Sequence, residues 1–167
     1  MTTHHDPRGA GLRGRRFAWA VLAASAAFLP AARAQNFNVT TGDWSNQANW
    51  NPAVVPTTTG TVTISGSRSA TIAAFNTGDA ATLSASSGGK LTVLGTLNSL
   101  GAISVASGGN VTQGEGSTVN AGGTIQVGLG GESYSVPSYS VASTGVLSMT
   151  GTASDLLVGY GGGTSGT

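Results

Sequence analysis

Short runs of alternating apolar and polar residues recur along the chain after residue 60. Val62 and Ile64 alternate with threonine and serine, and Leu91 and Val93 show the same spacing. Two further runs of this kind are 102–105 and 124–127. Because successive side chains of a β-strand point to opposite faces, each run has one apolar and one polar face. The pattern therefore predicts half-buried strands, for which threonine and valine are typical residues.

Glycine pairs separate these runs and mark predicted corners, because glycine readily adopts the positive φ angles of sharp turns. The pairs are Gly88-Gly89, Gly108-Gly109, Gly122-Gly123 and Gly130-Gly131. Segment 85–92 resembles 106–112 at a shift of about 20 residues, and weaker similarity follows at 120–125 and 142–147. Repeats of about this length are typical of stacked solenoids.

We therefore expect an all-β fold, a right-handed parallel β-solenoid (β-helix) over residues 61–167, of roughly four or five coils. Residues 35–60, which contain two tryptophans, are expected to cap its first coil, because terminal repeats need a closing element. An antiparallel β-sandwich is the alternative, since it also has short strands at regular spacing.

The first 34 residues have the pattern of a secretory signal peptide. Four arginines precede an apolar run of 13 residues, 17–29, which is shorter than the roughly 20 residues of a membrane-spanning helix. Ala32 and Ala34 supply the small residues that a signal peptidase reads, so we expect cleavage between Ala34 and Gln35. The alternatives are an uncleaved N-terminal anchor, and export by the twin-arginine route through Arg15-Arg16.

Removal of the signal changes the charge and leaves an unreactive composition. The whole chain is formally +1, whereas residues 35–167 hold two basic and five acidic side chains, a balance of −3. No basic stripe remains for nucleic acid. The chain has no cysteine, and both histidines lie in the signal, so histidine bases, thiol nucleophiles and common zinc ligands are missing. We expect no enzyme activity, cofactor or metal, and no membrane contact by the region after the signal.

Two segments carry a resemblance to large bacterial surface proteins. Trp44, Asn49, Trp50, Val55-Pro56 and Val62 fit the opening pattern G-x-W-x-x-x-x-N-W, V-P, V-x-I. Residues 156–167 fit the repeat L-x-V-G-x-x-G-x-G-T. These patterns resemble autotransporter passengers with β-strand repeats and PEP-CTERM-sorted proteins. The resemblance implies an exported protein at the cell surface or outer membrane, with a β-helical stalk and a C-terminal anchor or barrel.

No barrel or sorting tail follows in this sequence, so we expect an N-terminal fragment of a longer protein. The alternative is a short protein that a partner caps. Our leading hypothesis is a non-catalytic structural or adhesive passenger that contacts surface glycans or host ligands. A carbohydrate-binding module and the N-terminal part of a β-helical polysaccharide-active enzyme are the alternatives.

Trp44 and Trp50 are the main candidate site residues, with Asn49 beside them. They are interpreted either as the cap of the first coil or as a stacking platform for a sugar ring. Neighbouring polar side chains are expected to accept from the indole N–H groups: Asp43, Asn46, Asn49 and Asn51.

Other candidates are weaker. A glycosidase needs two nearby carboxyl groups, and Glu115 with Glu132 is the pair that stacking would align. The remaining acids, Asp43, Asp79 and Asp155, are interpreted as solvated turn residues. Tyr134 and Tyr139 lie in a serine-rich stretch, either a projecting adhesive loop or an ordinary strand edge.

Overall fold

The computed structural model describes residues 32–128 and 136–159. The chain divides into residues 1–31 and a compact unit that runs from Ala32 to Thr167. Most of the expected signal, including its apolar run, lies outside the described residues, so the signal stays a prediction. Within the described part of the chain, no helix combines the length and hydropathy needed to cross a membrane.

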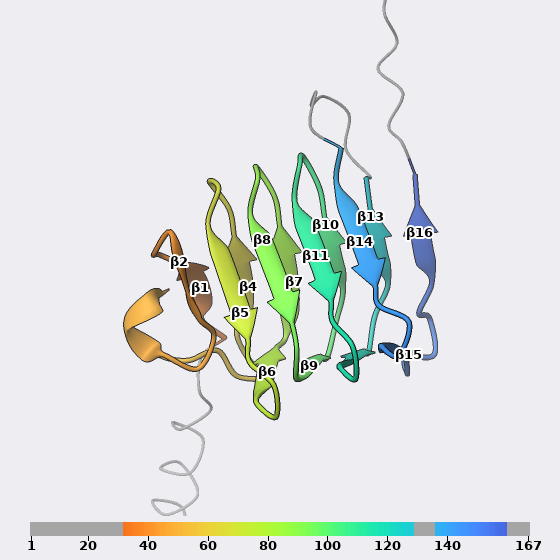
Figure 1. The fold of residues 1–167 in the computed structure, drawn as a ribbon, viewed down its shortest axis with the longest axis horizontal. Coiled ribbons are helices and arrows are strands. Elements are labelled where there is room, and N and C mark those ends of the chain that lie inside the picture. Colours follow the sequence, from red (N-terminus) through yellow and green to blue (C-terminus); the bar gives the residue numbers. More distant parts are fainter. Residues whose placement is uncertain (1–31, 129–135, 160–167) are drawn as a thin grey trace, which may run out of the picture. The chain divides into compact units, whose positions relative to one another are not determined.

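Three β-sheets make up the compact unit (Figure 1). Sheet A contains, in spatial order, β16 (Leu156–Val158), β13 (Ile125–Val127), β10 (Ile103–Val105), β7 (Thr82–Ala85), β4 (Thr61–Ile64), β1 (Ala34–Phe37) and β3 (Trp50–Asn51). Sheet B contains β14 (Ser138–Val141), β11 (Asn110–Gln113), β8 (Lys90–Val93), β5 (Ser69–Ile72) and β2 (Thr41–Asp43). Sheet C contains β15 (Val146–Met149), β12 (Thr118–Ala121), β9 (Thr96–Ser99) and β6 (Thr77–Ala80). A short 3-10 helix, η2 (Gln47–Asn49), precedes β3.

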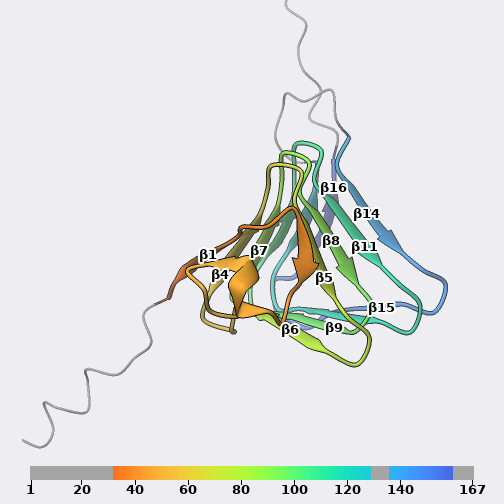
Figure 2. The same cartoon turned by 60° about the vertical axis from the view of Figure 1, so that its left-hand side comes forward.

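The chain visits the three sheets in rotation (Figure 2). Strand β4 lies in sheet A, β5 in sheet B and β6 in sheet C, and β7 then returns to sheet A in parallel with β4. We call one such passage a coil. Paired residues lie about one coil apart, as with Val62 opposite Leu83 and Leu91 opposite Val111. The prediction of an all-β fold with parallel strands is confirmed.

Strand β3 breaks the parallel pattern. It runs antiparallel to β1, with Trp50 opposite Phe37. Every other strand pairing in the described residues is parallel, because each neighbour comes from the next coil and crosses the sheet in the same direction. The antiparallel sandwich therefore does not describe these sheets. Strand β1 also pairs with β4, so sheet A continues across the expected boundary at residue 61.

The core consists of inward residues in register from coil to coil. In sheet A one such column is Val62, Leu83, Ile103 and Ile125, all buried. Complete burial of each such side chain contributes about 1.5–3 kcal/mol. The residues that alternate with them are polar and point outward: Thr63, Ser84, Ser104 and Gln126. The alternation that predicted the strands therefore separates the core from the surface.

Two glycines hold successive coils at the same corner. A Cβ on Gly89 would lie 2.1 Å from the carbonyl oxygen of Ile64, and a Cβ on Gly109 would lie 2.1 Å from that of Ala85. The similarity between 85–92 and 106–112 thus marks equivalent positions, since Leu91 pairs with Val111. The weaker similarities fall at other corners, 120–125 between β12 and β13 and 142–147 between β14 and β15. They are therefore not further copies of the same position.

Candidate functional site

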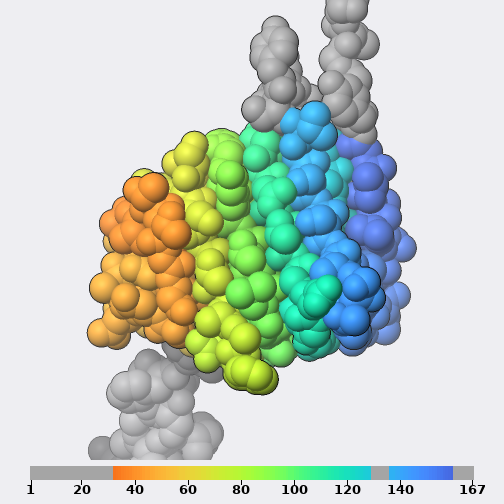
Figure 3. Space-filling view, viewed as in Figure 1, coloured from red at the N-terminus to blue at the C-terminus, as the bar shows by residue number. Residues whose placement is uncertain are grey.

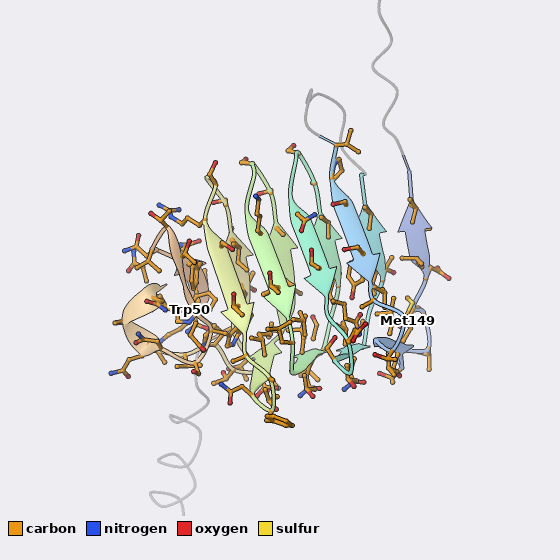
Figure 4. The ribbon with its side chains drawn as sticks, viewed as in Figure 1. Trp50 and Met149 are labelled. Atoms are coloured by element: carbon orange, nitrogen blue, oxygen red, sulfur yellow. The ribbon has the colours of Figure 1, made fainter. Side chains whose placement is uncertain are left out.

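Three aromatic side chains meet at the N-terminal end of the sheets. The rings of Phe37 and Trp50 are edge to face with centroids 5.0 Å apart, and those of Trp44 and Trp50 are 4.9 Å apart. Trp44 and Trp50 are only 1% and 2% exposed. Figure 4 places Trp50 at this end of the sheets, and Met149 of β15 toward the opposite end. We call Phe37, Trp44 and Trp50 the aromatic cluster.

The local sequence positions this cluster through β1, β2 and β3. Asp43 accepts hydrogen bonds from the backbone N–H and the hydroxyl of Ser45, at 2.7 and 2.6 Å. Asn46 caps η2 and accepts from the N–H of Ala48. Asn49 is buried, and its side-chain amide donates to the carbonyl of Asp43 at 2.8 Å. These bonds fix the loop that brings Trp44 back against Trp50.

The expected partners of the indole N–H groups prove wrong. Trp50 donates to the backbone carbonyl of Trp44 at 2.8 Å, whereas the buried N–H of Trp44 has no partner in the described residues. The side chains of Asp43 and Asn46 already accept from nearby backbone groups, and Asn49 acts as a donor. The side-chain oxygens of Asp43 and Asn46, which were expected to accept from the tryptophans, therefore accept from backbone groups of their own turn.

The sugar-stacking interpretation needs an open ring face, and this arrangement offers none at the two tryptophans. Gly78 of β6 lies close to the Trp44 ring, because a Cβ there would approach Cε2 of Trp44 to 3.0 Å. The indoles are thus enclosed by their neighbours and by one another. Their contacts are those of residues that fill the end of a core, and the glycan-binding role of Trp44, Trp50 and Asn49 stays a prediction.

The expected cleavage residues lie where sheet A begins. Ala32 and Ala34 are exposed, whereas Gln35 is 4% exposed and donates from its side-chain amide to the carbonyl of Val54 at 2.6 Å. The carbonyl of Arg33 accepts from the N–H of Thr61 at 3.1 Å. Cleavage after Ala34 would remove this last bond and leave the Gln35 side chain in place.

The described carboxylates do not gather into a metal-binding group. No three of its histidine, cysteine, aspartate and glutamate side chains are placed to hold a metal ion. Asp79 accepts from Asn98 at 3.0 Å, and Asn98 in turn accepts from Asn120 at 2.9 Å. Asp79 is thus part of a side-chain ladder on sheet C. Glu132 lies outside the described residues, so its expected alignment with Glu115 stays a prediction.

Hydroxyl and amide side chains line the outward faces of the sheets. On sheet B, Thr71, Thr92, Thr112 and Ser140 stand in register on successive strands. Figure 3 shows this face as adjoining bands of atoms, one for each strand. Strands of one sheet lie about 4.8 Å apart, so the hydroxyl groups repeat at that spacing. The result is a regular row of hydroxyl groups, beside which the neighbouring row contains the exposed Lys90.

Tyr139 and Gln113 form a polar pair that sequence reasoning did not find. Tyr139 belongs to β14 and is only partly exposed, so it is a strand residue, and Tyr134 lies outside the described residues. The hydroxyl of Tyr139 donates to Oε1 of Gln113 at 3.3 Å, and burial raises the pKa of the Tyr139 phenol. Gln113 is 1% exposed, in register with Val93. Its place after Val111 in an alternating run was the available signal for a buried amide.

Comparisons of the chain with protein-family models, with curated proteins and with solved structures give no match.

Proposed function

We propose that this chain is an exported, non-catalytic structural or adhesive protein that acts at the cell surface. In this proposal its three sheets form a β-solenoid that holds binding loops away from the membrane. The hand of the solenoid is right, because parallel strands joined by crossover connections are right-handed in almost all proteins. The signal expected at residues 1–34 supports export.

One observation carries the proposal: the described coils repeat a largely apolar interior and an exterior formed mostly by hydroxyl and amide side chains. Rows such as Thr71, Thr92 and Thr112 continue from strand to strand on the outside. An enzyme on this framework would interrupt such rows with converging acids, bases or a cleft. The described carboxylates instead lie at the end of β2, between strands, or in the ladder of Asp79 with Asn98. A uniform exterior suits a spacer or a broad contact surface.

Export is tested by producing the full chain with a C-terminal tag in a bacterial host and sequencing the N-terminus of the tagged product. We expect it outside the cytoplasm and beginning at Gln35. Ala34→Phe should block this cleavage, because the peptidase requires a small residue there, while Ala48→Phe, well beyond the cleavage site, serves as the control. An uncleaved wild-type chain in the cytoplasm would contradict export.

The non-catalytic part of the proposal is tested separately. The purified chain is incubated with a panel of plant, bacterial and animal polysaccharides, and new reducing ends and unsaturated products are measured. We expect none above the level of heat-unfolded protein. Product that forms only with folded chain would favour the polysaccharide-active alternative.

A further inference from the structure

One aromatic side chain lies outside the core. Phe75, in the corner between β5 and β6, is fully exposed, whereas the rings of the aromatic cluster are buried. The φ angle of Phe75 is 66°, in the left-handed region that favours glycine, so a bulky residue there strains the backbone. Residues held in such conformations gather at functional sites. A strained, fully exposed ring therefore favours a contact with another molecule.

An equivalent corner has the same turn without the strain. Residues 73–76 and 114–117 each connect sheet B to sheet C, and in both a backbone hydrogen bond, of 3.1 and 3.4 Å, joins the fourth residue to the first. The third residue of the second corner is Gly116, whose φ is 67° and whose Cβ position has no atom within 4 Å. The turn thus forms with glycine at this position, and the Phe75 side chain is not needed to build it.

Two rows of polar side chains run across sheet C, the face formed by β6, β9, β12 and β15 (Figure 2). One row consists of threonines, and the other of an acid and two amides: Thr77, Thr96 and Thr118, then Asp79, Asn98 and Asn120. The side-chain hydrogen bonds of the ladder hold the second row in place. Neighbouring strands lie about 4.8 Å apart, so each of these three coils presents one threonine and one acid or amide at that repeat.

Leu94 lies beside Phe75 on the next coil. It belongs to the corner between β8 and β9 and is 43% exposed. The two corners adjoin, because the N–H of Thr96 donates to the carbonyl of Asn76 at 2.9 Å. Phe75 and Leu94 thus form an apolar edge along the row of threonines.

The charges of this surface limit the kind of ligand. Within the described chain, sheet C and the corners that lead into it carry two charged residues, Asp79 and Glu115, both acidic. Arg68 and Lys90, the two basic residues after the expected signal, lie just before β5 and at the start of β8, in sheet B. Sheet C therefore offers no cation to a phosphate, sulfate or carboxylate group. Hydroxyl and amide side chains suit a neutral ligand that is itself rich in hydroxyl groups.

We infer that sheet C binds a neutral, extended polysaccharide, with one sugar ring stacked on Phe75. The inference rests on the adhesive role proposed above and names its ligand class. A sugar ring presents C–H groups to the face of an aromatic ring and hydroxyl groups at its rim, which matches an exposed phenylalanine beside threonine and amide groups. One residue of an extended β-linked chain is similar in length to the distance between strands. A chain that crosses the strands therefore meets the same kinds of side chain on each coil.

The first test measures binding of the full chain to cellulose, xylan, mannan, chitin and curdlan, with alginate and heparin as acidic probes. We expect retention by at least one neutral polysaccharide and by neither acidic one. Phe75→Gly should weaken that binding about ten-fold or more, because it removes the stacking ring. It should leave the thermal unfolding midpoint unchanged or raised, since glycine relieves the strained φ. Val54→Ala is the control, because Val54 is an exposed apolar residue in the loop after β3.

A second pair of variants tests the rows of sheet C independently of Phe75. Thr96→Val removes an outward hydroxyl from β9, and Thr92→Val removes one from β8 in sheet B, both with little change in side-chain size. We expect the first variant to weaken polysaccharide binding and the second to leave it unchanged. Circular dichroism should show both variants folded.

Three binding results would overturn the inference. They are no retention of the folded chain by any of the neutral polysaccharides, binding that Phe75→Gly or Thr96→Val leaves unchanged, and stronger retention by alginate or heparin. A lower unfolding midpoint in Phe75→Gly would also overturn it, because Phe75 would then stabilise the fold. None of these results bears on export or cleavage at Gln35, so failure of the ligand assignment is distinct from failure of the proposed function.

Discussion

The side-chain amide of Gln113 donates a hydrogen bond of 2.6 Å to the backbone carbonyl of Val146, 33 residues further along the chain. The same nitrogen donates to the carbonyl of Ser117 at 3.1 Å, and the amide oxygen accepts from Tyr139. One buried side chain thus joins the corner between β11 and β12 to the next coil. An amide in a core column serves as a link between coils.

We expect Gln113→Leu to destabilise the fold although leucine is apolar and similar in size. The substitution removes the donor to the carbonyls of Ser117 and Val146 and the acceptor of the Tyr139 hydroxyl, and each hydrogen bond lost costs about 0.5–1.5 kcal/mol. Gln126→Leu is the control, because Gln126 is a partly exposed residue of β13 whose free-energy change should stay within about 0.5 kcal/mol. Urea unfolding measures both, and equal losses would contradict the role of Gln113.

Alkaline pH should weaken the fold through Tyr139. Burial raises the pKa of its phenol above the ordinary value of about 10. Above that value the unfolded chain binds fewer protons than the folded chain, so the free energy of unfolding falls as the pH rises. Tyr139→Phe removes this group and should flatten the decline. Unfolding at a series of alkaline pH values tests this, and an unchanged slope in Tyr139→Phe would assign the decline to other groups.

Two glycines separate the effect of a contact from that of backbone conformation. Gly89→Ala forces a Cβ to within 2.1 Å of the Ile64 carbonyl oxygen, so coils must move apart. Gly116 has φ of 67° but open space around its Cβ position, so Gly116→Ala should cost only about 1–2 kcal/mol of backbone strain. We expect Gly89→Ala to be clearly the more destabilising in thermal unfolding. The reverse order would show that the corner relaxes freely.

The two tryptophans should respond differently to replacement by phenylalanine. Trp50→Phe removes the N–H that donates to the carbonyl of Trp44 and leaves that acceptor unpaired. Trp44→Phe removes an N–H that has no partner in the described residues. Both leave a similar gap, so Trp50→Phe should cost about 1–3 kcal/mol more in urea unfolding. Equal costs would mean that the bond to the Trp44 carbonyl contributes little.

Strand faces were predictable where large apolar residues alternate with polar ones. The runs around Val62 and Leu91 fall in β4 and β8, with the predicted residues buried. Strand β6 was not found because its inward residues are Gly78 and Ala80, which leave no apolar alternation to read. Gly78 is small because Ile72 and Trp44 occupy the space beside it. Because side chains from other strands fill the core beside β6, the strand itself needs no large apolar residues, and its sequence lacks the alternation that would predict it.

The site was less predictable than the strands. The tryptophans and their polar neighbours are close in sequence, so their grouping was predictable. Their hydrogen-bond partners were not, because these depend on the turn geometry. Asp43 and Asn46 accept hydrogen bonds from their own loop. Trp50 therefore donates to a backbone carbonyl, and Trp44 has no acceptor in the described residues. The division of each coil among three sheets was also not predicted, since equal strands look alike in sequence whichever sheet they join.

Coils of unequal length share one ladder. Asn110 is opposite Lys90, 20 residues earlier, and also opposite Ser138, 28 residues later. Most of the extra residues fall between β13 and β14 and the others between β11 and β12, yet the pairing resumes in register and the Asn110 amide donates to the Ser138 hydroxyl. Foreign peptides inserted between β13 and β14 would therefore leave the strands on either side in register, so this connection is a suitable insertion site.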